Sequence, residues 1–142
     1  MEILTGSSGS YPRVGETDEQ LKLRQAYQKW ESGDISDSEL EDVYRDYTKE
    51  VIKEQEKAGL DIVTDGQLRW YDPLSHFARN MGGCEINGLL RYFDTNFYFR
   101  QPVIVDEVSW NKPTVKEEFK NAEKVSRKRL NPVVTGTYTL AK

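Results

Sequence analysis

The stretch QEKAGLDIVTDGQ, residues 55–67, holds the pattern that decides the fold. It begins inside a segment whose buried-face positions recur every three or four residues, which predicts a helix with one buried face. These positions are Leu40, Val43, Tyr44, Tyr47, Val51, Gln55 and Ala58. Gly59 follows where a glycine commonly ends a helix, and residues 60–65 then form a short strand that finishes on polar residues. Helix, glycine and strand in this order are typical of α/β folds, so we predict that Asp65 and Gln67 lie at the carboxyl end of a parallel strand.

Upstream of this stretch, residues 3–5 form a short apolar run that opens into a loop of glycines and serines at residues 6–10. Such a loop lets backbone amides approach a ligand, although it is equally compatible with a simple turn. A first helix is predicted from Thr17, which has capping-box spacing to Gln20. A second is predicted to begin at the capping box of Ser36 and Glu39 and to carry the buried face described above.

Downstream, Asp72 and Pro73 predict the start of a helix that runs toward Met81 and stops at Gly82-Gly83. Residues 84–99 predict a β-hairpin that turns at Asn87-Gly88, and residues 102–105 predict a barrel strand. A last helix is predicted from the capping box of Thr114 and Glu117 to Asn131-Pro132, followed by a strand at residues 133–136. A basic cluster falls at the end of this helix, where cations complement the helix dipole: Lys124, Arg127, Lys128 and Arg129.

Composition excludes several classes of protein. The net charge of −4 argues against a nucleic-acid partner, which needs a clustered basic surface. No apolar run approaches the roughly 20 residues that span a bilayer, so no membrane association is expected. Cys84 is the one cysteine of the sequence, which excludes an intrachain disulfide. A cytoplasmic location is the resulting expectation.

Five segments in a fixed order resemble one family. They are GSYPR at residues 9–13, ISDSELE at 35–41, QEKAGLDIVTDGQ at 55–67, FRQPVIV at 99–105 and VVTGTYTL at 133–140. In this order they resemble the catalytic barrel of the cobalamin-independent methionine synthases. The resemblance implies an α/β fold in which residues 1–142 are the N-terminal part of a (β/α)₈ TIM barrel. A full barrel takes about 250 residues, so we expect about three to four βα units with a β-hairpin insertion.

The resemblance also implies a reaction and its cofactors. In this family a zinc ion binds homocysteine as its thiolate, which attacks the methyl group on N5 of methyltetrahydrofolate. Zinc lowers the pKa of a bound thiol, and the protein holds sulfur and methyl group in line. A corrinoid protein remains an alternative methyl donor. The expected function is therefore methyl transfer from methyltetrahydrofolate to homocysteine by an incomplete catalytic domain.

Site residues follow from the resemblance position by position. Ser10, with Gly9 and Ser8, matches the segment that contacts homocysteine. Gln67 stands where the family has a glutamate that binds the amino group of that substrate. Because an uncharged amide weakens this ion pair, either Asp65 supplies the charge or the substrate is a different thiol. A polar turn that caps a strand is the alternative reading of Asp65 and Gln67.

Three further positions complete the predicted substrate-binding set. Arg100 and Gln101 match positions near the pterin and glutamate tail of the folate, although an arginine before a proline-led strand also fits a solvent-facing role. Asp72 matches an aspartate of the same family stretch, and its place at a helix start explains it without function. We predict no catalytic side chain within these residues.

The zinc ligands are expected outside this chain segment. The family's ligands are a histidine, two cysteines and a glutamate from later strands, whereas this chain has only His76 and Cys84, which lack ligand spacing. Because an incomplete barrel exposes sheet edges, we expect a homo-oligomer or a complementary half-barrel as partner. The alternatives are a non-catalytic α/β binding or assembly module, and a related barrel of the uroporphyrinogen decarboxylase type.

Overall fold

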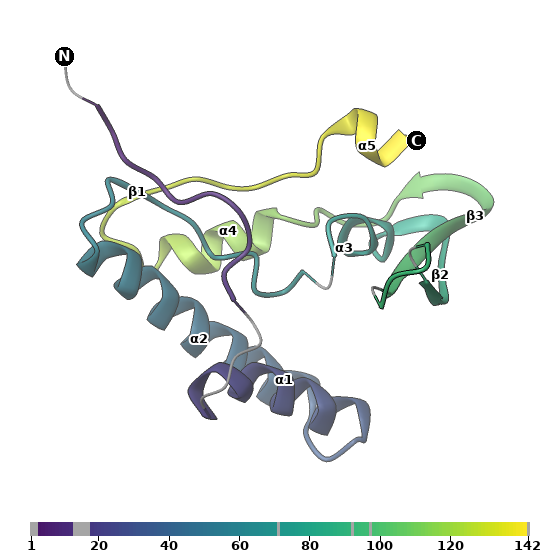
Figure 1. Cartoon of the computed structure of the whole chain (residues 1–142), viewed down its shortest axis with the longest axis horizontal. Helices are drawn as coiled ribbons and strands as arrows, with labels where there is room; N and C mark the ends of the chain where they lie inside the picture. The colour runs from purple at the N-terminus through teal and green to yellow at the C-terminus, as the bar shows by residue number, and fades with distance from the viewer. Residues whose placement is uncertain (1–2, 13–17, 71, 92, 97, 142) are drawn as a thin grey trace. The chain divides into compact units, whose positions relative to one another are not determined.

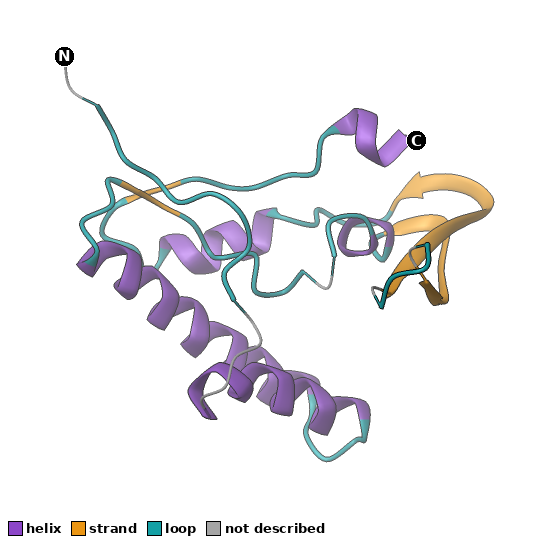
Figure 2. Ribbon diagram, in the orientation of Figure 1, coloured by secondary structure: helices purple, strands orange, loops and turns teal. Residues whose placement is uncertain are grey.

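The computed structural model divides the chain into two compact units, which we describe separately. The first comprises Met1–Leu68 with Glu118–Pro132, and the second comprises Arg69–Glu117 with Val133–Lys142. The residues that the structure describes are 3–12, 18–70, 72–91, 93–96 and 98–141. Figure 1 traces the chain by residue number, and Figure 2 shows its helices and strands.

Parallel strand pairing organises the first unit. Strand β1 (Ile62–Val63) pairs in parallel with β4 (Arg129–Leu130), and Gly6 forms a parallel bridge to Ile62 on the other side. The Thr5 carbonyl accepts hydrogen bonds from the backbone amides of Asp61 and Ile62, both at 3.0 Å. The predicted parallel pairing around residues 60–65 is therefore confirmed for these segments, although each strand is short.

Strand β4 lies where the sequence predicted the end of a helix. Helix α4 (Lys116–Glu123) stops early, and the basic cluster follows it instead of closing its last turn. The Asn131 amide donates to the Val63 carbonyl at 2.9 Å and so continues the pairing. Pro132 has no amide proton to donate, and residues 133–136 form no strand, so the predicted strand at these residues is wrong.

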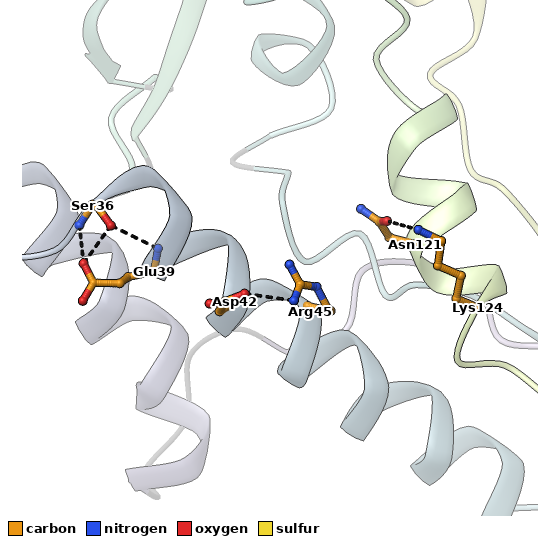
Figure 3. Close-up of polar contacts among 6 residues, drawn as sticks. All are labelled: Ser36, Glu39, Asp42, Arg45, Asn121 and Lys124. Atoms are coloured by element: carbon orange, nitrogen blue, oxygen red, sulfur yellow. Dashed lines mark hydrogen bonds and ion pairs between the residues drawn. The ribbon is translucent and has the colours of Figure 1, made fainter.

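Helix α2 (Asp37–Lys57) begins and ends as predicted. The Ser36 hydroxyl accepts from the Glu39 amide, and the Glu39 carboxylate accepts from the Ser36 amide, which completes the capping box seen in Figure 3. Gly59 adopts φ +84° just beyond the C-cap. Farther along the same helix, an exposed ion pair joins Asp42 and Arg45 at 2.9 Å (Figure 3).

The core of the first unit consists of two apolar clusters on the buried face of α2. One joins this helix to α1 (Asp18–Glu31) and to the segment after β1, and the other joins it to β1 and α4. Their buried members are Leu23, Tyr47, Val51 and Leu68 in the first, and Ile52, Val63 and Ala122 in the second. The side chains of the predicted capping box at Thr17 and Gln20 lie outside the described residues.

A β-hairpin dominates the second unit. Strands β2 (Met81–Arg91) and β3 (Tyr98–Trp110) pair antiparallel, which confirms a hairpin in this region, although it extends beyond the predicted residues 84–99. The predicted turn is wrong, because Asn87 and Gly88 lie inside β2 at a register shift, where they form an irregularity in the pairing. The barrel strand predicted at residues 102–105 is also wrong, since these residues belong to β3 and pair with β2.

Two short helices complete the second unit: α3 (Ser75–Ala78) and α5 (Thr137–Ala141). The helix predicted to run from Asp72 toward Met81 therefore ends early. The Asn80 amide group donates to the Thr114 hydroxyl at 3.2 Å, and the Asn80 carbonyl accepts from the Asn111 amide at 3.3 Å, which turns the chain into β2. Within the described residues, the helices lack the length and apolar character that a membrane crossing needs.

Candidate functional site

The turn after β1 places a strained, buried glutamine at the carboxyl end of that strand. Gln67 adopts φ +53°, a conformation that residues other than glycine rarely take, and its side chain is only 6% exposed. The Asp65 carboxylate accepts from the Gln67 amide at 3.0 Å and thereby stabilises the turn. Strained backbone held by its surroundings is a recurrent feature of ligand sites.

The loop that follows Gly6 converges on the same turn. The Ser10 hydroxyl donates to the Gln67 side-chain carbonyl at 3.2 Å, and the Tyr11 amide donates to the Gly66 carbonyl at 2.9 Å. The Tyr11 hydroxyl also donates to the Glu54 carboxylate on α2. The ends of two neighbouring parallel segments thus bring a hydroxyl and an amide together, which together can donate to a ligand and accept from it.

Ser8 and Gly9 lie in this loop and are exposed. Gly9 has φ +84°, so the loop uses the conformational freedom of glycine immediately before Ser10. Of the sequence-predicted residues in the first unit, the structure joins Ser10, Asp65 and Gln67 by hydrogen bonds to one turn.

The remaining predicted residues belong to the second unit. One Asp72 carboxylate oxygen accepts from the amides of Leu74 and Ser75, at 2.9 and 2.7 Å, so Asp72 caps the turn into α3. Its other oxygen is buried and has no hydrogen-bond partner among the described residues. The Ser75 hydroxyl donates to the Arg100 carbonyl on β3 at 3.1 Å, which links Asp72 to Arg100 through one buried serine. Gln101 is exposed on the same strand.

Sequence reasoning missed two residues that support the first-unit turn. Gln55 was counted as one position of a buried helix face, yet its amide bonds to the backbone of Thr64. Tyr11 stands beside Ser10 and ties the loop to both Gly66 and Glu54. A polar side chain among apolar residues on the buried face of a helix indicates a structural role, because a buried amide requires hydrogen-bond partners.

Among the described residues, no group of three or more histidine, cysteine, aspartate or glutamate side chains could hold a metal ion. His76 stacks on Trp70 with ring centroids 4.9 Å apart, and Cys84 lies on β2. The described side chains therefore do not fit a zinc centre.

Asp61 attaches the N-terminal segment to β1 through charge-assisted hydrogen bonds. Its carboxylate accepts from the Thr5 amide and the Thr5 hydroxyl, both at 2.9 Å. These bonds lower the pKa of this carboxyl below its usual 3.8, and the bond from the Thr5 amide has a larger effect than the bond from the Thr5 hydroxyl. A lowered pKa in the folded state contributes stability that is complete above the unfolded-state pKa and is lost as pH falls through the folded-state pKa.

We therefore expect Asp61→Asn to make the acid limb of the stability profile shallower. Below about pH 4 the wild-type protein loses the stabilisation from Asp61, whereas the variant has no charge to lose. Urea unfolding from pH 6 to pH 2 measures this difference. Asp42→Asn is the matched control, because it removes a carboxylate from an exposed pair of small energetic value. Equal acid limbs for Asp61→Asn and wild type would contradict the assignment.

Comparison with known proteins identifies the family. The chain matches the family described as "Cobalamin-independent synthase, Catalytic domain" over residues 3–142. The chain belongs to this family. The methionine synthase of Sulfurisphaera tokodaii is 36% identical over 134 residues, which are 94% of this chain and 38% of that protein. The methionine synthase of Saccharolobus solfataricus is 32% identical, with the same 94% and 38% covered.

A solved structure supports the fold. The B12-independent methionine synthase from Shewanella sp. W3-18-1, in complex with selenomethionine, superposes with a TM-score of 0.71 at 20% identity. The match covers 96% of this chain and 39% of that one. The α/β fold is thus similar to part of a cobalamin-independent synthase, and the chain spans 38% of the length of the curated relatives quoted above.

Proposed function

We propose that this chain contributes the amino-acid-binding part of a methionine-synthase-like methyltransferase, which transfers a methyl group from methyltetrahydrofolate to homocysteine. The observation that carries the proposal is the hydrogen bond between Ser10 and Gln67, because it joins the ends of two neighbouring parallel segments at a strained, buried turn. Strand carboxyl ends are where barrel enzymes place their sites. Family membership and the methionine synthase relatives support the same reaction.

In this proposal the chain's residues bind and orient the substrate. The Ser10 hydroxyl and the Gln67 side-chain amide bind the polar end of homocysteine. Gly9 and Ser8 let the backbone approach the substrate closely, and Asp65 fixes the turn. In the second unit, Arg100, Gln101 and Asp72 are proposed to bind methyltetrahydrofolate. The complex of the Shewanella protein with selenomethionine, a methionine analogue, supports an amino-acid site in this fold.

The proposed enzyme also needs a zinc ion and further barrel strands, which these residues do not supply. Zinc would activate the thiol, and we propose that its ligands lie outside this chain segment, since the described side chains do not fit a metal site. Since the chain spans 38% of its relatives, the parallel sheet is proposed to be completed by a complementary part of the barrel or by a second copy. A cytoplasmic location fits this biosynthetic role. Light scattering of the purified protein measures the copy number.

Calorimetric titration of the purified protein with homocysteine and with methionine tests the proposed function. Wild-type protein should bind both compounds at one site, and Ser10→Ala should weaken both because it removes the hydroxyl that meets Gln67. Loss of one hydrogen bond to a ligand corresponds to about a threefold to tenfold change in affinity. The matched control is Ser7→Ala, a serine of the same loop outside the proposed set. Wild-type protein that binds neither compound, also in the presence of zinc and methyltetrahydrofolate, refutes the proposal.

A further inference from the structure

A single glutamine side chain reaches from helix α2 to the strand that precedes the candidate site. Gln55 is only 5% exposed, and its neighbours on the buried face, Val51 and Ile52, are apolar. An unpaired amide at such a position would carry a substantial desolvation cost, so its presence calls for a specific set of partners.

Both backbone groups of Thr64 bond to this one amide. The Gln55 nitrogen donates to the Thr64 carbonyl at 2.9 Å, and the Gln55 oxygen accepts from the Thr64 amide at 3.0 Å. The same nitrogen donates to the Val51 carbonyl at 3.2 Å. The partners fix the orientation of the amide, because a carbonyl can only accept and a backbone N–H can only donate. Gln55 therefore makes the pair of bonds that a residue of an adjacent β-strand would make.

Thr64 connects Gln55 to the two segments that carry Gln67 and Ser10. Its hydroxyl accepts from the Gly66 amide at 3.2 Å, and the Gly66 carbonyl accepts from the Tyr11 amide at 2.9 Å. Gln67 follows Gly66, and Ser10 precedes Tyr11. A continuous series of hydrogen bonds thus runs from α2 to the two segments whose side chains meet at 3.2 Å.

We propose that Gln55 is a positioning residue of the binding site, which holds Thr64 so that Ser10 and Gln67 converge on the ligand. It acts through the backbone and does not touch the substrate. The choice of ligand in the test below rests on the proposed function, whereas the backbone constraint rests only on the contacts of Gln55 and Thr64. A residue that served packing alone would change stability without changing the affinity of the folded protein for ligand.

The variant Gln55→Glu distinguishes a positioning role from a packing role, because only the positioning role makes the affinity for ligand depend on the protonation of residue 55. A protonated carboxyl has one O–H donor and one carbonyl acceptor, so it can reproduce both bonds to Thr64. An ionised carboxylate only accepts, and it would face the carbonyls of Thr64 and Val51. Burial raises the pKa of a carboxyl at this position. The ionisable residues nearest in sequence are of both signs: Lys53, Glu54, Glu56 and Lys57 on α2. Asp65 follows Thr64 at the strand end.

Methionine is the probe, because its thioether and carboxylate do not titrate between pH 5.5 and 8. We expect Gln55→Glu to bind it within about threefold of wild type at pH 5.5 and at least about tenfold more weakly at pH 8. Gln55→Met, which keeps the side-chain length and removes every polar atom, should bind weakly at both pH values. Wild-type protein measured in parallel corrects for effects of pH that do not involve position 55.

Hydrogen exchange supplies a readout that needs no ligand. In Gln55→Met, the amides of Thr64, Gly66 and Gln67 should exchange at least about tenfold faster than in wild type, while amides in the middle of α2 stay protected. A uniform loss of protection, or a ratio of variant to wild-type affinity in Gln55→Glu that does not change with pH, overturns the positioning role. If wild type binds no methionine, the proposed function fails and the exchange pattern alone decides the role of Gln55.

Discussion

Replacing Gly66 with alanine is expected to lower the free energy of unfolding by about 3 kcal/mol, the sum of two separate costs. Gly66 has φ +72°, where an L-residue with a Cβ atom is disfavoured by about 1–2 kcal/mol. A Cβ atom at this position would also lie 2.8 Å from the Tyr11 Cβ and 3.0 Å from the Val51 Cγ1. Because Val51 is buried and Tyr11 is held by its hydrogen bond to Gly66, neither atom can move away freely.

Gly59→Ala is the matched control for this substitution. Gly59 has φ +84°, and among the described residues no heavy atom other than those of its chain neighbours lies within 4 Å of the position its Cβ would take. It therefore carries the conformational cost without the steric one, and should destabilise by about 1 kcal/mol. Urea unfolding of both variants measures the difference. Equal losses of stability at Gly59 and Gly66 would mean that the close approach of Tyr11 to Gly66 does not exist in solution.

Residues 36–67 could be predicted because their structure follows from local signals. The capping box of Ser36 and Glu39, the helical spacing of apolar residues and the glycine at position 59 each act within a few residues of chain. The proximity of Ser10 and Gln67 also followed, since the carboxyl ends of neighbouring parallel strands meet at one edge of a sheet.

Elements whose position depends on distant partners could not be placed from the sequence. Strand β4 has only two residues and no periodicity, and its position is set by pairing with β1 and by the Asn131 bond to Val63. Asn87-Gly88 has a strong local preference for a tight turn, yet pairing of β2 with β3 on both sides of it leaves an irregularity there instead. Gln55 was missed as a support of the site because its helical spacing matched the buried face, and spacing does not reveal hydrogen-bond partners.

Replacing Gln67 with glutamate is expected to tighten the binding of methionine by about tenfold at pH 8. The Gln67 side chain is an uncharged amide that already accepts from Ser10. A carboxylate at this position can still accept from Ser10 and can also form a charge-assisted bond to the ammonium group of an amino acid, which is roughly twice as strong as a neutral one. The gain depends on charge, so it should be absent for 4-(methylthio)butanoate, which is methionine without its amino group.

The pH dependence of this gain follows from the burial of position 67. Burial raises the pKa of the new carboxyl, and the ligand's ammonium group lowers it again in the complex. Methionine therefore favours the ionised form, and the advantage of Gln67→Glu is complete above the free-protein pKa and decreases as pH falls below it. Gln67→Ala should weaken both ligands, and methionine more strongly, because it removes both the partner of Ser10 and the side-chain oxygen that can accept from the ammonium group. An equal change for both ligands in Gln67→Glu would show that residue 67 does not approach the amino group of the bound ligand.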